Sequence, residues 1–365
     1  MQTVTINTTI KDHEIMEKKD MTIRDLAKLA GVSVATVSRS MNNSPLVQEA
    51  TKQKILKLAD EVGFELNASA KGLATSKVNT IGVILPPEYD QFGQQLYYSS
   101  LLNDLRGTLE RANYDLIVTF LTNRFTGKSN ILSLINRRKV DGLIILQETL
   151  EPELLDFLEK KNVPYIFSHY PPSSEDISVD AVYPDHLWGG KLAGEHLASL
   201  GCQRMMCIGA ENKVNEFVLR ERGFARALTT HGLDFSEKHV LYASLTVNDG
   251  YQIVREHANK FQATEAVFVV TDLLAFGVIA GLKDIGLAIP QDISVVGYDD
   301  IPLASMLKPT LTTIHQPREE IAKKTCRRLI EKIQHVEKSS AKIKETIRPH
   351  LIVRESCKKP VRKKT

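Results

Sequence analysis

The residues best suited to recognising a partner lie near the start of the chain, from Ser33 to Met41. This short segment combines hydroxyl groups, small apolar side chains and one arginine. An arginine can donate two hydrogen bonds to the O6 and N7 atoms of guanine, and small methyl groups can contact the C5-methyl group of thymine. Hydroxyls at the start of a helix, beside its free N–H groups, suit phosphate. The composition therefore favours a helix that enters the major groove of duplex DNA.

Two short helices joined by a tight turn are predicted to present this segment. Thr22 is a typical capping residue, and Asp25 three positions later completes a capping box. Gly31 permits the turn, where a side chain would be costly at positive φ. Ser33 caps the second helix, which we predict from Val34 to Met41 with Val37 and Met41 facing inward. Two ordinary surface helices of a larger core are the alternative interpretation of this pattern.

The segment from Thr22 to Asn43 contains the run Ala-Gly-Val-Ser-x-x-Thr-Val-Ser-Arg, which ends at Arg39. This run resembles the DNA-binding head of the LacI/GalR family of bacterial transcriptional regulators. The residues predicted to contact DNA in the head are Thr22, Ser33, Val34, Ala35, Thr36, Ser38, Arg39 and Asn42. The resemblance implies a helix-turn-helix head over residues 21–66, preceded by a disordered extension over residues 1–20.

The resemblance also implies a hinge helix or linker over residues 67–78. In the family a leucine of the hinge wedges into the minor groove and kinks the DNA, and Leu73 stands at that position. Asn67 and Lys71 would contact DNA beside it. Gly72 lowers helix propensity by about 1 kcal/mol relative to alanine, which should loosen the hinge when no DNA is bound.

From residue 79 the chain alternates short apolar strands with amphipathic helices, which predicts an α/β fold with two doubly wound parallel-sheet lobes. This body resembles the family's effector domain, which is related to periplasmic sugar-binding proteins. Residues 79–357 should form the effector-binding and dimerisation domain. The resemblance implies an N-terminal lobe of about 79–180 plus 316–335 and a C-terminal lobe of about 181–315 plus 345–357. Residues 358–365 form a basic tail.

Ligands bind beyond the carboxyl ends of strands in such sheets, and several polar or aromatic residues follow predicted strands. Arg220, expected in a loop that enters a helix, and Asp299 match effector anchors of the family. Asp272 is predicted to cap a helix instead of touching ligand. Packing is the alternative role for the two tyrosines, and a surface position for the histidine. The predicted effector-binding residues are Tyr97, Tyr98, His169, Arg220, Thr271, Asp299 and Gln316.

Composition and motifs bound the remaining functions. Apolar content is 42%, charged content is 25% and the formal net charge is +3 over 365 residues. No Gly-x-Gly-x-x-Gly, Gly-x-Ser-x-Gly or metal-ligand spacing occurs, so we expect no enzyme, no cofactor and no metal. The four cysteines are expected to be free thiols. The first twenty residues lack the apolar core of a signal peptide, which favours a cytoplasmic protein without a membrane partner.

These features together predict a sequence-specific transcriptional repressor that acts as a homodimer on a near-palindromic operator. A small-molecule effector, expected to be a sugar, would control it. Control by a protein co-regulator or a nucleoside is the first alternative. A periplasmic-type solute-binding protein is the second, because the body alone would also fit that class.

Overall fold

The computed structural model describes residues 21–42, 44–64, 77–86, 94–172, 178–335 and 341–359. The chain divides into two compact units, Met1–Val78 and Asn79–Thr365, which are called the head and the body below. Among the described residues, no helix combines the length and the apolar character needed to cross a bilayer.

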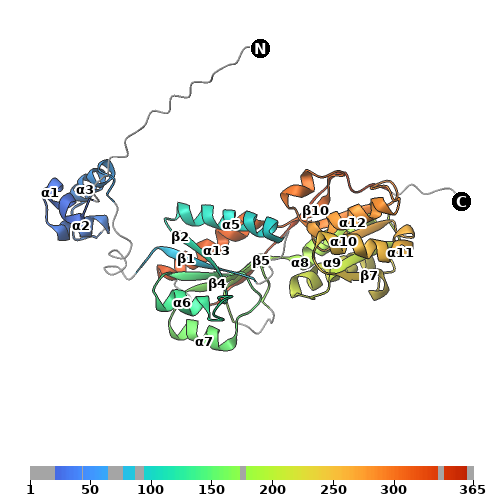
Figure 1. The fold of residues 1–365 in the computed structure, drawn as a ribbon, viewed down its shortest axis with the longest axis horizontal. Coiled ribbons are helices and arrows are strands. Elements are labelled where there is room, and N and C mark those ends of the chain that lie inside the picture. Colours follow the sequence, from blue (N-terminus) through green and yellow to red (C-terminus); the bar gives the residue numbers. More distant parts are fainter. Residues whose placement is uncertain are drawn as a thin grey trace, which may run out of the picture. The chain divides into compact units, whose positions relative to one another are not determined.

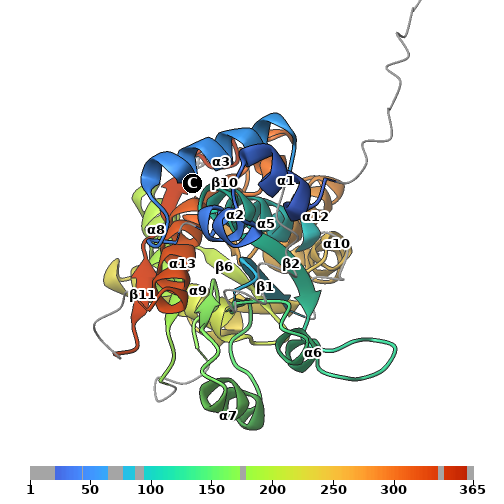
Figure 2. The same ribbon diagram turned by 90° about the vertical axis from the view of Figure 1, so that its left-hand side faces the viewer.

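The head contains three helices, α1 (Ile23–Ala30), α2 (Val34–Met41) and α3 (Glu49–Glu61). Figure 2 shows them facing the viewer. The predicted capping box at the start of α1 is present, because the Thr22 and Asp25 side chains each accept a hydrogen bond from the backbone N–H of the other residue. Gly31 ends α1 in the left-handed conformation, with φ of 69°. Leu26, Val37 and Ile55 are fully buried where the three helices meet.

The N-terminal lobe of the body is a six-stranded parallel sheet with the order β11-β5-β4-β3-β1-β2 (Figure 1). Its strands are β1 (Thr80–Leu85), β2 (Asp115–Phe120), β3 (Gly142–Ile145), β4 (Tyr165–Ser168), β5 (Ala181–Pro184) and β11 (Lys344–Ile347). Its helices are α5 (Gln94–Arg111), α6 (Asn130–Asn136), α7 (Pro152–Lys160) and α13 (Arg318–Ile333). The strands β1, β3 and β4 consist almost entirely of buried residues, as expected for a sheet covered on both faces.

The C-terminal lobe has a second six-stranded sheet with the order β12-β10-β9-β8-β6-β7, parallel except for the pair β10 and β12. Its strands are β6 (Met205–Ala210), β7 (Val240–Ala243), β8 (Ala266–Val269), β9 (Ser294–Asp299), β10 (Thr312–His315) and β12 (His350–Ile352). Its α-helices are α8 (His186–Ser199), α9 (Asn215–Thr230), α10 (Val247–Glu256), α11 (Ala258–Gln262) and α12 (Asp272–Asp284), and short 3₁₀ helices cover Glu237–His239 and Pro302–Ser305. The α/β fold with two doubly wound lobes is therefore confirmed.

The chain crosses between the lobes three times, after β5, after β10 and after β11. Two of the predicted boundaries are wrong by a few residues. Because β5 and β11 pair with each other in the first sheet, residues 181–184 and 344–347 belong to the N-terminal lobe. Both strands are only four residues long, and β11 has a single buried residue, so β11 lacks the continuous apolar pattern of the inner strands.

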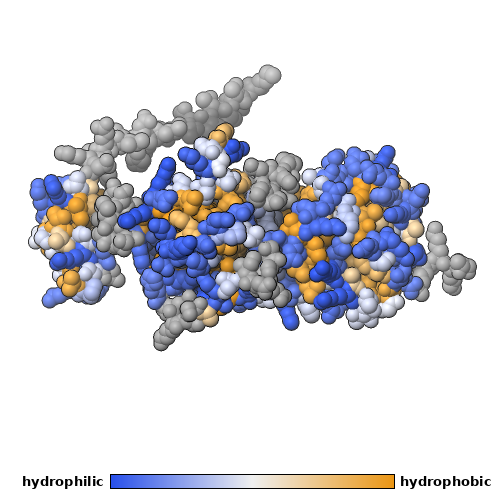
Figure 3. All heavy atoms as spheres, turned by 90° about the horizontal axis from the view of Figure 1, so that it is seen from below, coloured by the Kyte–Doolittle hydropathy of each residue, from blue (hydrophilic) through white to orange (hydrophobic). Residues whose placement is uncertain are grey.

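The outside of the body is largely polar. On the face shown in Figure 3, hydrophilic residues surround smaller patches of apolar ones. Each lobe instead keeps its large apolar side chains between sheet and helices, with Phe224, Phe268 and Tyr298 at the centre of the C-terminal lobe. Each lobe thus has its own hydrophobic core, and three crossings of the chain join the two lobes.

Candidate DNA-reading helix and effector cleft

The helix α2 presents the predicted DNA-contacting residues on the side that the head does not bury. Val34, Ala35 and Arg39 are exposed, and Thr36 and Ser38 are half-buried. Val37 is fully buried on the opposite side. Ser33 caps the helix, since its Oγ accepts a hydrogen bond from Thr36 N at 3.1 Å. The helix start therefore combines free backbone N–H groups with accessible small side chains, as a groove-reading helix requires.

Two further predicted DNA contacts also have roles inside the head. The Thr22 hydroxyl is exposed and donates to the Asp25 carboxylate at 2.6 Å. Asn42 is half-buried, and its Nδ2 donates to the Ser38 carbonyl at 2.9 Å. The predicted hinge contacts Asn67, Lys71 and Leu73 lie outside the described residues.

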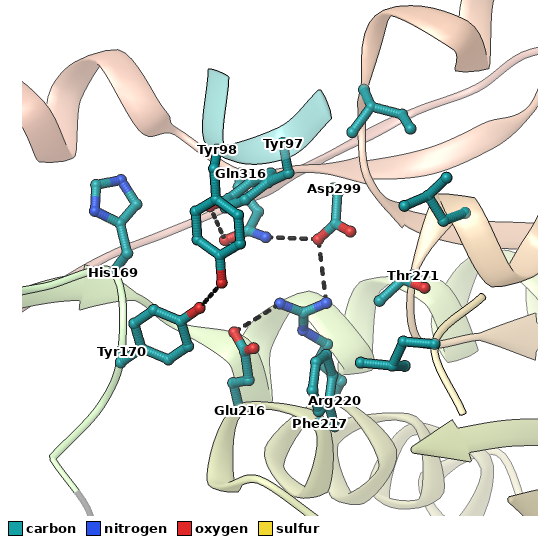
Figure 4. Close-up of a pocket in the computed structure, with 13 residues that line it drawn as sticks. Tyr97, Tyr98, His169, Tyr170, Glu216, Phe217, Arg220, Thr271, Asp299 and Gln316 are labelled. Carbon is teal, nitrogen blue, oxygen red and sulfur yellow. Dashed lines mark hydrogen bonds and ion pairs between the residues drawn. The ribbon is translucent and has the colours of Figure 1, made fainter. Parts of the chain in front are cut away.

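The predicted effector residues come together in a cleft between the two lobes of the body (Figure 4). Tyr97 and Tyr98 reach it from α5, and His169 follows β4. From the other lobe come Arg220 on α9, Thr271 before α12 and Asp299 at the end of β9, and Gln316 lies in the crossing after β10. All seven line the same cavity, although up to 219 positions separate hydrogen-bonded members of the set.

Arg220 is the centre of this arrangement and lies inside α9. The predicted loop position is wrong, because α9 begins at Asn215, five residues before the arginine. The side chain is buried, and its guanidinium lies 3.9 Å from the centre of the Tyr298 ring. Its Nη1 donates to Asp299 Oδ1 at 3.1 Å and to the Val270 carbonyl at 2.7 Å.

Glu216, one helical turn before Arg220, completes the anchor. Its Oε2 accepts from Arg220 Nη2 at 3.0 Å. Burial by itself disfavours the charged arginine, but these two carboxylates outweigh it and raise the pKa of Arg220 above its ordinary value. The sequence prediction did not include Glu216, although the spacing of four residues on one helix face could have suggested it.

Close packing of two helices places Arg220. A Cβ atom on Gly223 would stand 2.0 Å from the Leu187 carbonyl oxygen of α8, and one on Gly190 would stand 1.9 Å from the Arg220 carbonyl oxygen. Only glycine allows the backbones of α8 and α9 to approach so closely. Gly190 and Gly223 therefore determine how closely α9, the helix that carries Arg220, packs against α8.

A chain of hydrogen bonds connects Arg220 to Tyr97 of the other lobe. Asp299 Oδ1 accepts from Gln316 Nε2 at 2.6 Å, and Gln316 Oε1 accepts from the Tyr97 hydroxyl at 3.1 Å. Asp299 has a positive φ of 114°, an unusual conformation for a residue with a side chain. Burial raises the pKa of Asp299, and Arg220 opposes this shift. The Tyr98 hydroxyl is hydrogen-bonded to that of Tyr170, a further lining residue.

His169 is buried, unlike the surface histidine offered as its alternative. Its backbone is left-handed, with φ of 68°, and its Nδ1 is 2.8 Å from the Ser168 hydroxyl. Burial, with Arg318 nearby, lowers the pKa of His169 to about 3. Burial, with Arg220, also lowers the pKa of His186 well below its usual range. Both imidazoles are therefore neutral at pH 7.

Thr271 caps α12 in place of Asp272 and keeps its predicted place in the cavity. Thr271 caps α12, since its Oγ1 accepts from Leu274 N at 3.3 Å, and it also lines the cavity. Asp272 is fully buried and accepts from Thr313 Oγ1 at 2.6 Å and from Ile301 N at 3.0 Å. The prediction that Asp272 caps the helix is wrong, because its carboxylate ties α12 to β10 and to the loop after β9.

The cleft has an inner and an outer chamber. The inner chamber, beside Arg220 and Asp299, encloses about 40 Å³. The outer chamber encloses about 200 Å³ and shares five residues with the inner one. These shared residues are Tyr98, Tyr170, Glu216, Phe217 and Leu245. Glu148, which accepts from Asn215 N of the opposite lobe at 2.7 Å, lines the outer chamber and was missed from the sequence.

Comparisons with known proteins match both units of the chain. Residues 22–67 match the model of bacterial regulatory proteins of the lacI family, and residues 195–357 match that of the periplasmic binding protein-like domain. The HTH-type transcriptional repressor PurR of Vibrio vulnificus is 30% identical over 339 residues, which cover 93% of this chain and 99% of that protein. The chain belongs to the LacI family.

Solved structures agree with this membership. A LacI family regulator from Enterococcus faecium with bound ribose is 31% identical, with a TM-score of 0.66, and the match covers 77% of this chain and 99% of that one. The lac repressor dimer bound to operator and the anti-inducer ONPF has a TM-score of 0.74 at 24% identity. The match covers 93% of this chain and 99% of that one. The second likeness supports the fold alone.

As a LacI-family protein, the chain is a DNA-binding transcriptional repressor with a periplasmic-binding-protein-like effector domain. The alternative class of a periplasmic-type solute-binding protein is excluded by the helix-turn-helix head. Among the residues that the structure describes, no three His, Cys, Asp or Glu side chains lie close enough together to hold a metal ion.

Proposed function

We propose that this protein represses transcription as a homodimer on a near-palindromic operator, and that a sugar bound in the cleft controls it. The observation that carries the proposal is the convergence of Arg220, Glu216 and Asp299 from one lobe with Tyr97 and Tyr98 from the other. Carboxylate and guanidinium groups pair with hydroxyls, while aromatic rings stack on the apolar face of a sugar ring.

The volume of the cleft favours a small ligand. The inner and outer chambers enclose about 40 and about 200 Å³, whereas pockets for drug-sized ligands usually have about 300–1,000 Å³. A monosaccharide suits this space better than a longer oligosaccharide. The bound ribose of the Enterococcus faecium regulator supports the same ligand class.

Ligand binding would act on the crossings between the lobes. A sugar that contacts both lobes favours their closed arrangement, and a change of that arrangement at a dimer interface can alter how two heads fit one operator. Couplings of about 1–3 kcal/mol are usual and would change operator affinity about 5- to 150-fold.

The test is a panel of monosaccharides, disaccharides and nucleosides against the full chain, measured by melting temperature. A monosaccharide should raise the melting temperature of the wild type but not of Asp299→Asn, which retains the size of the side chain and loses its charge. A hit should then change the affinity for a duplex selected from random-sequence DNA. If only a nucleoside stabilised the protein, the effector would be a nucleoside and not a sugar. No response from any compound would favour control by a protein co-regulator.

A further inference from the structure

Arg220 has little hydrogen-bonding capacity left for a ligand. A guanidinium carries five N–H groups, and four of them donate within the protein. Its Nε donates to His186 Nδ1 at 3.3 Å, its Nη1 to Val270 and Asp299, and its Nη2 to Glu216. Two parallel N–H groups are needed to hold a carboxylate or phosphate in the usual forked geometry. Arg220 can therefore give a ligand one hydrogen bond but cannot form the fork.

The charge of the cleft also opposes an anion. Among the described residues that line either chamber, the charged side chains are one guanidinium, Arg220, and three carboxylates, Glu148, Glu216 and Asp299. His169 is neutral at pH 7. Arg318 stands behind Asp299, where its Nη1 donates to the Asp299 carbonyl and its Nε lies 3.8 Å from the Asp104 carboxylate. Its charge is therefore partly balanced outside the cavity.

Glu216 has the most influence on this balance. It lines both chambers, and its side chain is only 12% exposed. In a site that excludes water, a buried carboxylate acts strongly on a nearby ligand charge. Figure 4 shows its carboxylate between Tyr170 and Arg220, and Glu216 lines both chambers.

Resting on the proposed function, we infer that the cleft selects ligands without a negative charge, and that Glu216 is the residue that sets this selectivity. The ligand class is thus a free sugar or nucleoside with unmodified hydroxyls, and phosphorylated forms of the same compounds are rejected. Hydroxyl groups of such a ligand donate to the carboxylates, while one ligand oxygen accepts from Arg220.

The experiment compares matched pairs against the full chain by isothermal titration calorimetry. The probes are ribose and ribose 5-phosphate, glucose and glucose 6-phosphate, and adenosine and adenosine monophosphate. In any pair that binds, the wild type should prefer the uncharged member by at least about tenfold, because like charges repel strongly in such a site. Glu216→Gln, which retains the shape and can still accept from Arg220, should reduce this preference about tenfold.

Two more variants separate specificity from folding. Glu148→Gln removes a charge from the outer chamber without touching Arg220, so it should reduce the preference by a smaller factor. Glu237→Gln changes an exposed carboxylate outside the cleft and should leave the preference unchanged. Equal or tighter binding of a phosphate by the wild type would overturn the inference and leave the proposed function standing. A preference that survives in both cleft variants would also overturn it, and binding of no probe would overturn the proposed function together with this inference.

Discussion

The reading helix and the effector cleft use polar side chains in opposite ways. At the start of α2 the Ser33 hydroxyl is exposed and bonds to the neighbouring Thr36, and Arg39 is exposed further along the helix. In the cleft, Arg220, Asp299 and Gln316 are buried and bonded to one another across long sequence distances. Substitutions of exposed side chains that make no cap, such as Arg39, should therefore change binding without changing stability, whereas substitutions in the cleft should change both.

The strongest test of this contrast is removal of Arg220. Arg220→Ala leaves the buried Asp299 and the partly buried Glu216 without their cation, so the free energy of unfolding of the body should fall by about 3–5 kcal/mol. Arg226→Ala removes an exposed arginine from the same helix and should change it by less than about 0.5 kcal/mol. Urea denaturation measures both, and similar losses in the two variants would refute the structural role of Arg220.

A smaller effect should follow from crowding the contact between α8 and α9. Gly223→Ala inserts a methyl group against the Leu187 carbonyl, and such overpacking costs about 1–3 kcal/mol. Gly107→Ala in α5 is the matched control, because the new Cβ atom would lie 3.7 Å from the flexible end of Arg111. That variant should be neutral or slightly stabilised, since alanine favours helix. Thermal melting that showed no difference between the two would contradict the packing account.

Acid should distinguish the body from the head. The folded body keeps His169 neutral down to a pH of about 3, whereas the unfolded chain binds that proton below a pH of about 6.5. Stability from this group is complete above pH 6.5 and is lost as the pH falls toward 3. Between pH 7 and 5.5 the wild type should lose about 1 kcal/mol more than His169→Gln. The described head has no histidine and should not respond in this range, and equal pH slopes in both proteins would rule out His169 as the cause.

Loss of the first helix cap should affect the head alone. Thr22→Ala removes the hydroxyl that accepts from Asp25 N, which costs about 1 kcal/mol in comparable caps. Hydrogen exchange should show faster opening of α1 amides and unchanged protection in the body. Exchange that increased in both units would mean that the two do not unfold separately.

The head could be predicted from the sequence because its determinants are local. The capping box spans three residues, and the reading face follows the helical repeat, so both were found by spacing. The inner strands of both sheets could be predicted because their apolar residues are also adjacent in the sequence. The role of Asp272 was not predicted, because a buried carboxylate at the start of a helix has the same sequence pattern as a helix cap. The helical position of Arg220 was not predicted either, because no side-chain cap marks the start of α9.

Residues that depend on distant contacts were the hardest to predict. Glu148 enters the cleft through a bond to Asn215, 67 positions away, which no local pattern reveals. The short edge strand β11 pairs with β5, and its largely polar sequence alone does not favour a strand over a loop. The resemblance to a family predicted which residues line the cleft. The ion pairs among its charged side chains could be found only from the structure.

The most direct measurement is the sequence discrimination of the reading helix. Full-length wild type, Arg39→Ala and Lys57→Ala are titrated at one salt concentration with a selected operator duplex and with a shuffled duplex of equal length. Arg39→Ala should lose about 1–3 kcal/mol of discrimination between the two duplexes. Lys57→Ala removes an exposed cation from α3 and should weaken binding to both duplexes equally or not at all. Full discrimination by Arg39→Ala would contradict the claim that the outer face of α2 reads the operator.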